Sequence, residues 1–236
     1  MTGPATSDRR AEIEAGLAAV RARVEDACAR AGRDPAEVTT VVVTKTFPAS
    51  DVALLAQLGV REVGESKDSE AAAKAAELAD LGLRWHFVGR LQSNKARSVA
   101  AYADVVHSLD RGKLVGGLSR GAVERDVVID CLVQVSLDGD PSRGGALADD
   151  VPALADRVAG AEGLRLAGVM AVAPQGVDPG EPFSRLAEAA ARLRAGHPAA
   201  TIVSAGMSGD LEAAIGAGAT HLRVGSAVLG SRPPLE

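Results

Sequence analysis

The stretch Thr-Thr-Val-Val-Val-Thr-Lys-Thr, residues 39–46, carries the clearest signal for the fold of this chain. Consecutive valines next to threonines are typical of a buried parallel strand, and a lysine stands where that strand should end. Val43 and Lys45 alternate with Thr44, so both side chains lie on one face of the predicted strand. In a barrel that face can point inward, where loss of water favours the neutral amine that attacks aldehydes.

Strand-like runs continue along the chain and alternate with alanine-rich helical segments. Including the first, they cover residues 39–45, 61–64, 83–88, 104–107, 127–136, 164–172, 200–204 and 220–224. No glycine- or proline-rich linker and no change in composition separates them. This α/β pattern favours a closed (β/α)8 TIM barrel over an open sheet, and we expect residues 1–236 to form a single domain.

A long amphipathic helix is predicted before the first strand, with Ser7 and Asp8 capping its start and Gly32 near its end. Little chain follows the last strand, so the final helix should have only one or two turns. We therefore expect the N-terminal helix either to cover the gap left in the outer ring of helices or to block one mouth of the barrel.

The composition of the 236-residue chain limits the classes of partner. Apolar residues make up 47% and charged residues 24%, and the net charge of −5 does not favour nucleic-acid binding. No apolar stretch approaches the roughly 20 residues that span a bilayer, and the N-terminus lacks the apolar core of a signal peptide. Cys28 and Cys131 show neither disulfide-framework nor metal-site spacing. We expect a cytoplasmic protein without a membrane or nucleic-acid partner.

Glycine–serine turns follow the seventh and eighth predicted strands, at Gly206-Met207-Ser208 and Gly225-Ser226. Most such pairs are ordinary turn and capping residues, and Ser208 is expected to cap the helix that follows it. In TIM barrels, however, these two loops commonly bind phosphate. A phosphate site together with a lysine that can form a Schiff base with an aldehyde suggests pyridoxal 5'-phosphate (PLP) as the cofactor.

Several motifs together resemble the YggS/PROSC family of PLP-binding homeostasis proteins, and they occur in that family's order. They are Thr-Lys-Thr-Phe-Pro-Ala at 44–49, Gly-Glu at 64–65, Trp-His-Phe-Val-Gly-Arg-Leu-Gln-Ser-Asn-Lys at 85–95, Gly-Met-Ser at 206–208 and Arg-Val-Gly-Ser at 223–226. The block at 85–95 is highly specific, and the resemblance runs almost end to end. It implies a barrel of the alanine racemase N-terminal type.

The resemblance also implies which residues contact PLP. These candidates are Lys45, Val43, Ser66, Met207, Ser208, Arg223, Gly225 and Ser226. Lys45 would carry the cofactor as a Schiff base, the two turns would surround its phosphate, and Arg223 would face the pyridine nitrogen. Ser66 stands where the family most often has asparagine, so a contact from that amide would be shortened or replaced.

An arginine opposite the pyridine nitrogen bears on the chemistry. A guanidinium accepts no proton, so it would keep the nitrogen unprotonated and weaken PLP as an electron sink. Alanine racemases, which resemble this barrel, add a second domain that supplies a tyrosine base, whereas Tyr102, the only tyrosine here, lies in a helical stretch before the fourth strand. We therefore expect a monomeric PLP carrier or buffer without robust turnover, which passes the cofactor to apo PLP-dependent enzymes.

Two other functions stay open at this stage. A weak PLP-dependent amino-acid racemase predicts substrate-dependent exchange of the α-proton of the amino acid. A cofactor-free interaction protein that kept the barrel predicts that replacing Lys45 leaves ligand absorbance and stability unchanged.

Other polar clusters carry weaker signals. His86, His107 and His221 lie on or beside predicted strands, but no HxH or HxxxH spacing supports a metal site, and hydrogen-bonded barrel histidines are the better interpretation. Arg90 and Lys95 belong to a small basic cluster. Because the net charge is negative and aromatic residues are few, we interpret this cluster as a solvated or partner-facing helix start.

Overall fold

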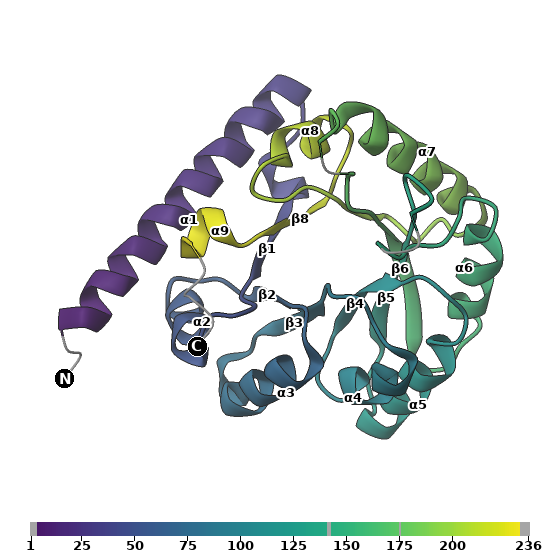
Figure 1. Cartoon of the computed structure of the whole chain (residues 1–236), viewed down its shortest axis with the longest axis horizontal. Helices are drawn as coiled ribbons and strands as arrows, with labels where there is room; N and C mark the ends of the chain where they lie inside the picture. The colour runs from purple at the N-terminus through teal and green to yellow at the C-terminus, as the bar shows by residue number, and fades with distance from the viewer. Residues whose placement is uncertain (1–3, 141–142, 175, 232–236) are drawn as a thin grey trace.

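Parallel strands form the centre of the molecule. Across the described residues, 4–140, 143–174 and 176–231, eight strands close into a barrel in the order in which they occur along the chain. In the computed structural model they are β1 (Thr39–Val43), β2 (Glu62–Glu65), β3 (Arg84–Phe87), β4 (Val105–Leu109), β5 (Ile129–Gln134), β6 (Leu164–Met170), β7 (Ile202–Ser204) and β8 (His221–Val224). Each lies within a run predicted from the sequence or extends it by a residue or two, so the predicted TIM barrel is confirmed (Figure 1).

A helix follows each strand, and the helices surround the barrel (Figure 1). They are α2 (Ala49–Gln57), α3 (Asp68–Glu77), α4 (Ala96–Ala100), α5 (Val115–Arg125), α6 (Val151–Ala159), α7 (Gly180–Gly196), α8 (Leu211–Gly216) and α9 (Ser226–Leu229). Short 3-10 helices are η1 (Pro35–Glu37), η2 (Ala79–Leu81) and η3 (Ser93–Lys95). The final helix α9 has about one turn, as the sequence predicts.

Alternate residues of each strand face opposite sides of the barrel wall. On the outer side, Val42 and Val63 pack with helix residues in the main hydrophobic core. Inside the barrel, Leu132, Ala167 and Met170 form a small separate cluster. The interior is otherwise largely polar. Its buried polar residues include His86, His107, Asp130, Gln134, Ser204, His221 and Arg223.

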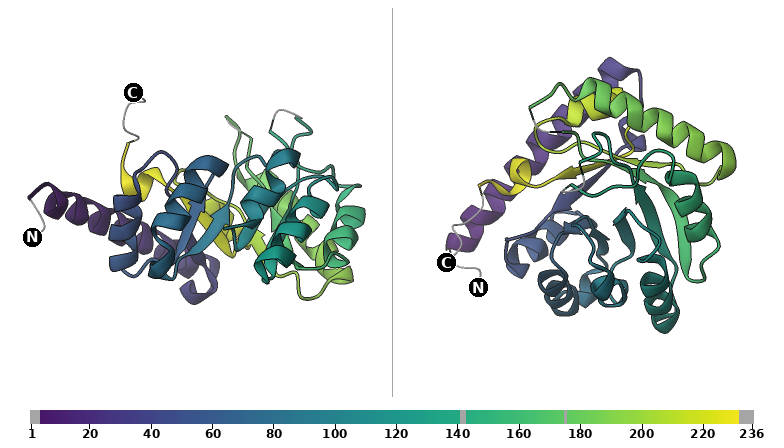
Figure 2. Two further views of the ribbon diagram at one scale, coloured as in Figure 1. Left: turned by 90° about the horizontal axis from the view of Figure 1, so that it is seen from below. Right: turned by 45° about the vertical axis from the view of Figure 1, so that its right-hand side comes forward.

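The long N-terminal helix α1 (Pro4–Ala31) lies outside the barrel beside α8 and α9 (Figure 1), and its first turns project beyond the barrel (Figure 2). Arg9 Nη2 donates to Asp51 of α2 at 2.6 Å. Arg23 donates to both carboxylate oxygens of Glu212 in α8, at 2.7 and 2.9 Å. Of the two expected roles, α1 therefore covers the gap in the outer ring of helices.

The start of α1 differs from the expected one. The helix begins at Pro4, so Ser7 and Asp8 lie inside it and the predicted cap is wrong. Proline has a helical φ and no backbone N–H, which suits the first position of a helix. Among the described residues no helix, the 28-residue α1 included, is both long and apolar enough to cross a membrane.

Gly16 allows α1 to approach α9 closely. A Cβ at Gly16 would overlap the backbone of Val228 in α9. Replacing Gly16 with alanine should push the two helices apart and lower the free energy of unfolding by about 1–3 kcal/mol. Urea unfolding followed by circular dichroism measures this difference.

Gly116→Ala in α5 is the matched control. The contact nearest to its added Cβ would be Arg120 Nη1 at 3.8 Å, so nothing has to move. This variant should keep or raise the free energy of unfolding, because alanine favours a helix more than glycine does. If Gly16→Ala were as stable as the wild type, the proposed close contact between α1 and α9 would be wrong.

Candidate functional site

Lys45 lies in the turn between β1 and α2 and is half-buried. Val42 packs in the outer core, and the Thr44 hydroxyl donates to Glu65 Oε1 at 2.6 Å on the same outer side of the wall. The alternation along β1 therefore turns Val43 toward the interior, as predicted. Lys45 follows it at the mouth formed by the C-terminal ends of the strands, where TIM barrels carry their active sites.

A buried ion network between β2 and α3 holds one side of the turn that carries Lys45. Lys74 Nζ donates to Glu65 Oε1 and Glu70 Oε1, each at 2.7 Å, and to the Thr44 carbonyl oxygen at 2.9 Å. Burial raises the pKa of the Glu65 carboxyl, and the hydrogen bonds from Lys74 and Thr44 oppose that shift. The backbone just before Lys45 is thus fixed from the outer side of the barrel.

The same network reaches the residue after Lys45. Thr46 has a left-handed backbone with φ of 71°, which is unfavourable for a β-branched residue. Its backbone N–H donates to Glu70 Oε1 at 2.6 Å, and this bond helps to hold the unfavourable conformation. Both neighbours of Lys45 are therefore bonded to the Glu70–Lys74 network.

The structure brings the two glycine–serine turns together. Ser226 Oγ donates to Ser208 Oγ at 3.3 Å, and the Ala227 backbone N–H donates to the same oxygen at 3.3 Å. A Cβ at Gly225 would lie 3.1 Å from the Val43 carbonyl oxygen, so glycine allows this turn to approach β1 closely. The turns after β7 and β8 and the end of β1 therefore meet at one place on the mouth of the barrel.

Ser208 does not cap α8, so that expectation is wrong. Asp210 occupies the N-cap position instead, and its Oδ1 accepts the backbone N–H of the exposed Met207 at 2.5 Å. The Ser208 hydroxyl is directed to the neighbouring turn, where it accepts from Ser226 and Ala227. The aspartate that follows two residues later is thus the polar residue at the start of the helix.

Arg223 lies in the barrel interior, paired in register with Val41 of β1. Its neighbours in β8 pack in the outer core, which leaves its own side chain inside. Arg223 Nη1 donates to Ser204 Oγ at 2.6 Å and Nη2 donates to the Ala171 carbonyl oxygen at 2.9 Å. Burial lowers the pKa of the guanidinium to about 10, so it still carries its charge at neutral pH.

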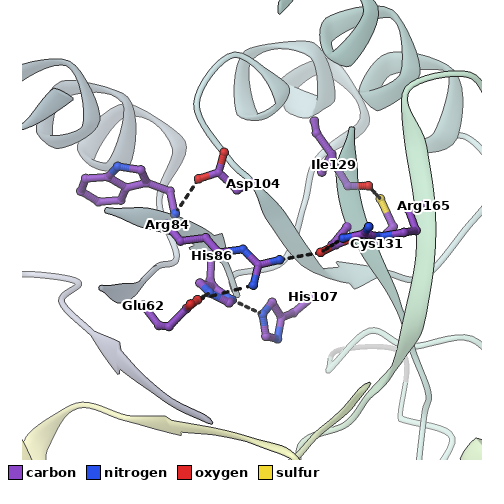
Figure 3. Close-up of polar contacts among 10 residues, drawn as sticks. Glu62, Arg84, His86, Asp104, His107, Ile129, Cys131 and Arg165 are labelled. Atoms are coloured by element: carbon purple, nitrogen blue, oxygen red, sulfur yellow. Dashed lines mark hydrogen bonds and ion pairs between the residues drawn. The ribbon is translucent and has the colours of Figure 1, made fainter. Parts of the chain in front are cut away.

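The barrel histidines are hydrogen-bonded, as the sequence predicts. His86 Nδ1 lies 2.8 Å from His107 Nε2, and His86 Nε2 bonds the Glu62 carboxylate (Figure 3). His221 Nδ1 lies 3.1 Å from Thr220 Oγ1. Within the part of the chain that the structure describes, no group of three or more histidine, cysteine, aspartate or glutamate side chains is arranged to hold a metal ion.

Ser66 follows β2 and lines a pocket of about 650 Å³ formed by the loops after β2, β3 and β4. Arg90, Lys95 and Arg111 line the same pocket, and Lys95 Nζ lies 3.4 Å from Asp68 Oδ2. The basic cluster noted in the sequence therefore faces this pocket. Ser66 belongs with these loops, on the opposite side of β1 from the two glycine–serine turns.

This arrangement fits an aldehyde that carries a phosphate. The hydroxyls of Ser208 and Ser226 lie together. Gly225 has no side chain, and this allows its turn to lie close to β1. Hydroxyl and backbone donors of this kind bind phosphate oxygens, and a lysine amine binds an aldehyde carbon. Arg223 adds a charged donor from inside the barrel, so the residues present suit PLP.

Comparison with known proteins places the chain in a family. Residues 16–233 match the family model of the alanine racemase N-terminal domain. The chain is 45% identical to the pyridoxal phosphate homeostasis protein of Mycobacterium tuberculosis over 95% of both proteins. It is 37% identical to the protein of that name in Escherichia coli, over 94% of this chain and 97% of the other.

Solved structures give the same fold. PipY of Synechococcus elongatus, solved with PLP bound, matches with a TM-score of 0.80 and 33% identity over 92% of this chain and 100% of PipY. Alanine racemase from Corynebacterium glutamicum, at 15% identity and a TM-score of 0.60, shares the fold alone. Fold and site thus define a PLP-type barrel of the alanine racemase N-terminal class. The chain belongs to the pyridoxal phosphate homeostasis family.

The residues that hold Lys45 and Arg223 in place were not found from the sequence. Lys74 and Glu70 stand four residues apart on α3, a spacing that indicates a helical ion pair but not its link to β1. Ser204 is the last residue of an apolar strand-like run and lies two residues after Ile202. The two side chains therefore share one face of the strand, and this could have indicated that Ser204 points inward. Neither pattern shows which distant side chain is bonded.

The Glu70 carboxylate should stabilise the turn around Lys45. Replacing Glu70 with alanine removes the acceptor of the Thr46 N–H and one partner of buried Lys74, so the free energy of unfolding should fall by about 1–3 kcal/mol. Urea unfolding measures the loss. Glu77→Ala, on the exposed side of the same helix, is the control and should change stability by less than about 0.5 kcal/mol. Equal effects of the two substitutions would contradict this role.

The free energy of unfolding should also decrease as the pH is lowered, because of a buried histidine. Burial is the main cause that lowers the pKa of His221 to about 4, against an ordinary value of 6.5, so the unfolded chain binds a proton that the folded chain does not. Between pH 6.5 and 4 the free energy of unfolding should therefore decrease as pH falls, by about 2 kcal/mol at pH 5 from this group.

Urea unfolding at intervals from pH 7.5 to 4.5 tests this expectation. His221→Gln should show a smaller decrease than the wild type, because the group that takes up a proton on unfolding is gone. A profile unchanged in His221→Gln would assign the pH dependence to other groups.

Proposed function

We propose that this protein binds PLP as a Schiff base on Lys45 and serves PLP homeostasis as a carrier or buffer without robust catalytic turnover. The observation that carries the proposal is the meeting of the Ser208 and Ser226 turns with the end of β1, just before Lys45. The pyridoxal phosphate homeostasis proteins among its relatives and the PLP-bound PipY support the same conclusion.

Each part of the proposed site has a distinct task. The bound cofactor supplies an aldehyde that links reversibly to an amine and a ring that withdraws electrons from it. Lys45 provides the amine, with Val43 packed beside it on the inner face of β1. Met207, Ser208, Gly225 and Ser226 bind the phosphate, and Arg223 faces the ring nitrogen. Ser66 contributes a short hydroxyl from the loop after β2.

The charge of Arg223 supports a holding role over turnover. Its guanidinium is held by Ser204 and Ala171 and remains charged at neutral pH, so it donates hydrogen bonds and accepts no proton. A donor at the ring nitrogen keeps that nitrogen unprotonated and weakens the ring as an electron sink. We further propose that apo PLP-dependent enzymes receive the cofactor, and that the protein acts in the cytoplasm as a single-domain monomer.

Reduction with borohydride tests the linkage to Lys45. Purified protein loaded with PLP and then reduced should carry a phosphopyridoxyl group on the peptide that contains Lys45, as read by mass spectrometry. Lys45→Ala should lose both this adduct and the visible absorption of bound PLP, because the amine is gone. Lys113→Ala, an exposed lysine after β4, is the matched control and should keep both signals.

Two results would change the proposal. An unmodified Lys45 in protein supplied with PLP would contradict it and leave the cofactor-free interaction protein. Amino-acid α-proton exchange in deuterated water, faster than with free PLP and dependent on Lys45, would instead favour the weak racemase.

A further inference from the structure

A chain of hydrogen bonds crosses the barrel interior from Arg223 to Glu62. Arg223 Nη1 bonds Ser204 Oγ at 2.6 Å, and Ser204 Oγ lies 2.9 Å from His107 Nδ1. His107 Nε2 lies 2.8 Å from His86 Nδ1, and His86 Nε2 bonds the Glu62 carboxylate (Figure 3). The step from β7 to β4 joins strands that are not neighbours in the sheet, so the chain passes through the barrel and not along its wall.

This chain of hydrogen bonds approaches solvent at Glu62. Arg223, Ser204, His107 and His86 are buried, whereas 26% of the Glu62 side chain is exposed. Glu62 is the first residue of β2 and Lys45 lies two residues after the end of β1, so the two lie toward opposite ends of a parallel barrel. The hydrogen-bond chain therefore connects the N-terminal face of the barrel with Arg223, the residue proposed to face the cofactor ring.

Arg223 at one end of the hydrogen-bond chain and Glu62 at the other determine which atom donates in each bond between them, when the rings of His86 and His107 are neutral. Arginine only donates, so Ser204 Oγ accepts from Arg223. The Glu62 carboxylate only accepts, so His86 carries its proton on Nε2 and accepts at Nδ1. His107 must then donate from Nε2 and accept at Nδ1, and the donor that it accepts from is the Ser204 hydroxyl.

The surroundings favour this order. Burial lowers the pKa of His107 well below its ordinary value, so its ring is neutral at pH 7. Burial alone would raise the pKa of Glu62, but the hydrogen bond from His86 and the positive charge around the carboxylate, to which Arg84 contributes, outweigh it and lower that pKa, so the carboxylate is ionised. The His221 ring lies 6.4 Å from His86 and is itself kept neutral by burial.

We propose that Ser204 and His107 are positioning residues that hold Arg223 against the cofactor ring, and that His86 and Glu62 set the proton order on which they depend. Because the Ser204 hydroxyl is committed to His107, its lone pairs remain available to the guanidinium. The opposite tautomer of His107 would present an N–H to Ser204, whose hydroxyl would then have to turn toward another acceptor. This inference rests on the proposed function, since it concerns how the cofactor is held.

The proton order can be read without the cofactor. The sequence contains four histidines, so nitrogen-15 NMR of histidine-labelled apo protein is tractable, and His107→Phe and His86→Gln assign the signals. At pH 7.5 His107 should carry its proton on Nε2 and none on Nδ1, and the Nδ1 of His86 should accept the hydrogen bond from His107 Nε2. A His107 ring that is protonated on Nδ1, alone or in addition to Nε2, would overturn the proposal.

Binding measurements test the positioning of Arg223. Ser204→Ala removes the acceptor of the Arg223 bond, so the Kd for PLP should rise about tenfold and the visible absorption of bound PLP should change. Ser204→Thr keeps the hydroxyl and should restore both values. Arg165→Ala removes the ion pair between the mostly exposed Arg165 side chain and buried Asp130. Arg165 contacts no member of the hydrogen-bond chain, so this variant should leave both values unchanged. His107→Phe should resemble Ser204→Ala with a smaller increase in Kd.

The outcomes separate this inference from the proposed function. If the wild type forms no Schiff base on Lys45, the proposed function fails, and the apo NMR still decides the proton order. If PLP binds to Lys45 but Ser204→Ala keeps the wild-type Kd and spectrum, the hydrogen-bond chain does not position Arg223, and the inference is wrong. Should His107→Phe fail to fold, Ser204→Ala with its Ser204→Thr rescue gives the decision.

Discussion

The alternation of inward and outward side chains along each strand is the constraint on which the rest of the structure depends. In β8, Leu222 and Val224 pack among the helices, which leaves Arg223 inside the barrel. In β1, Val42 packs outward and leaves Val43 inside. A shift of one residue in β8 would exchange its faces and place Leu222 or Val224 where the guanidinium lies, and the same shift in β1 would turn Val43 outward. The apolar pattern of two neighbouring strands therefore sets where the charged groups stand.

A polar barrel interior has a cost that its hydrogen bonds must offset. Buried charges and imidazoles destabilise a fold unless they find partners, and an aliphatic filling of the same volume would often be more stable. Here Leu132, Ala167 and Met170 form only a small apolar cluster inside the barrel, while Arg223 and His107 bond to neighbouring interior groups. Such a departure from an apolar core is expected where the polar groups serve a ligand.

The sequence was sufficient for the barrel because each strand and helix is encoded locally. The run of valines before Lys45 and the two glycine–serine turns indicated their positions without any distant partner. The contacts that hold the site depend instead on which distant segments meet. Ser204 and His107 are 97 residues apart, and no local pattern pairs them. The errors at the starts of α1 and α8 have a related cause, since several polar residues near each start could have served as the cap.

The two networks act on opposite sides of the same wall. From outside, Lys74 and Glu70 fix the backbone on both sides of Lys45, and from inside, Ser204 and Ala171 fix Arg223 on the adjacent strand. The backbone that carries Lys45 and the guanidinium of Arg223 are thereby held by rigid elements, which lowers the cost of ordering the site when a cofactor binds. The proposed phosphate side is different, because Met207 and Ser226 are exposed in short turns joined by contacts of 3.3 Å. For the proposed PLP carrier this arrangement means a site that is preorganised on the ring side and accessible on the phosphate side, which suits both retention and release of the cofactor.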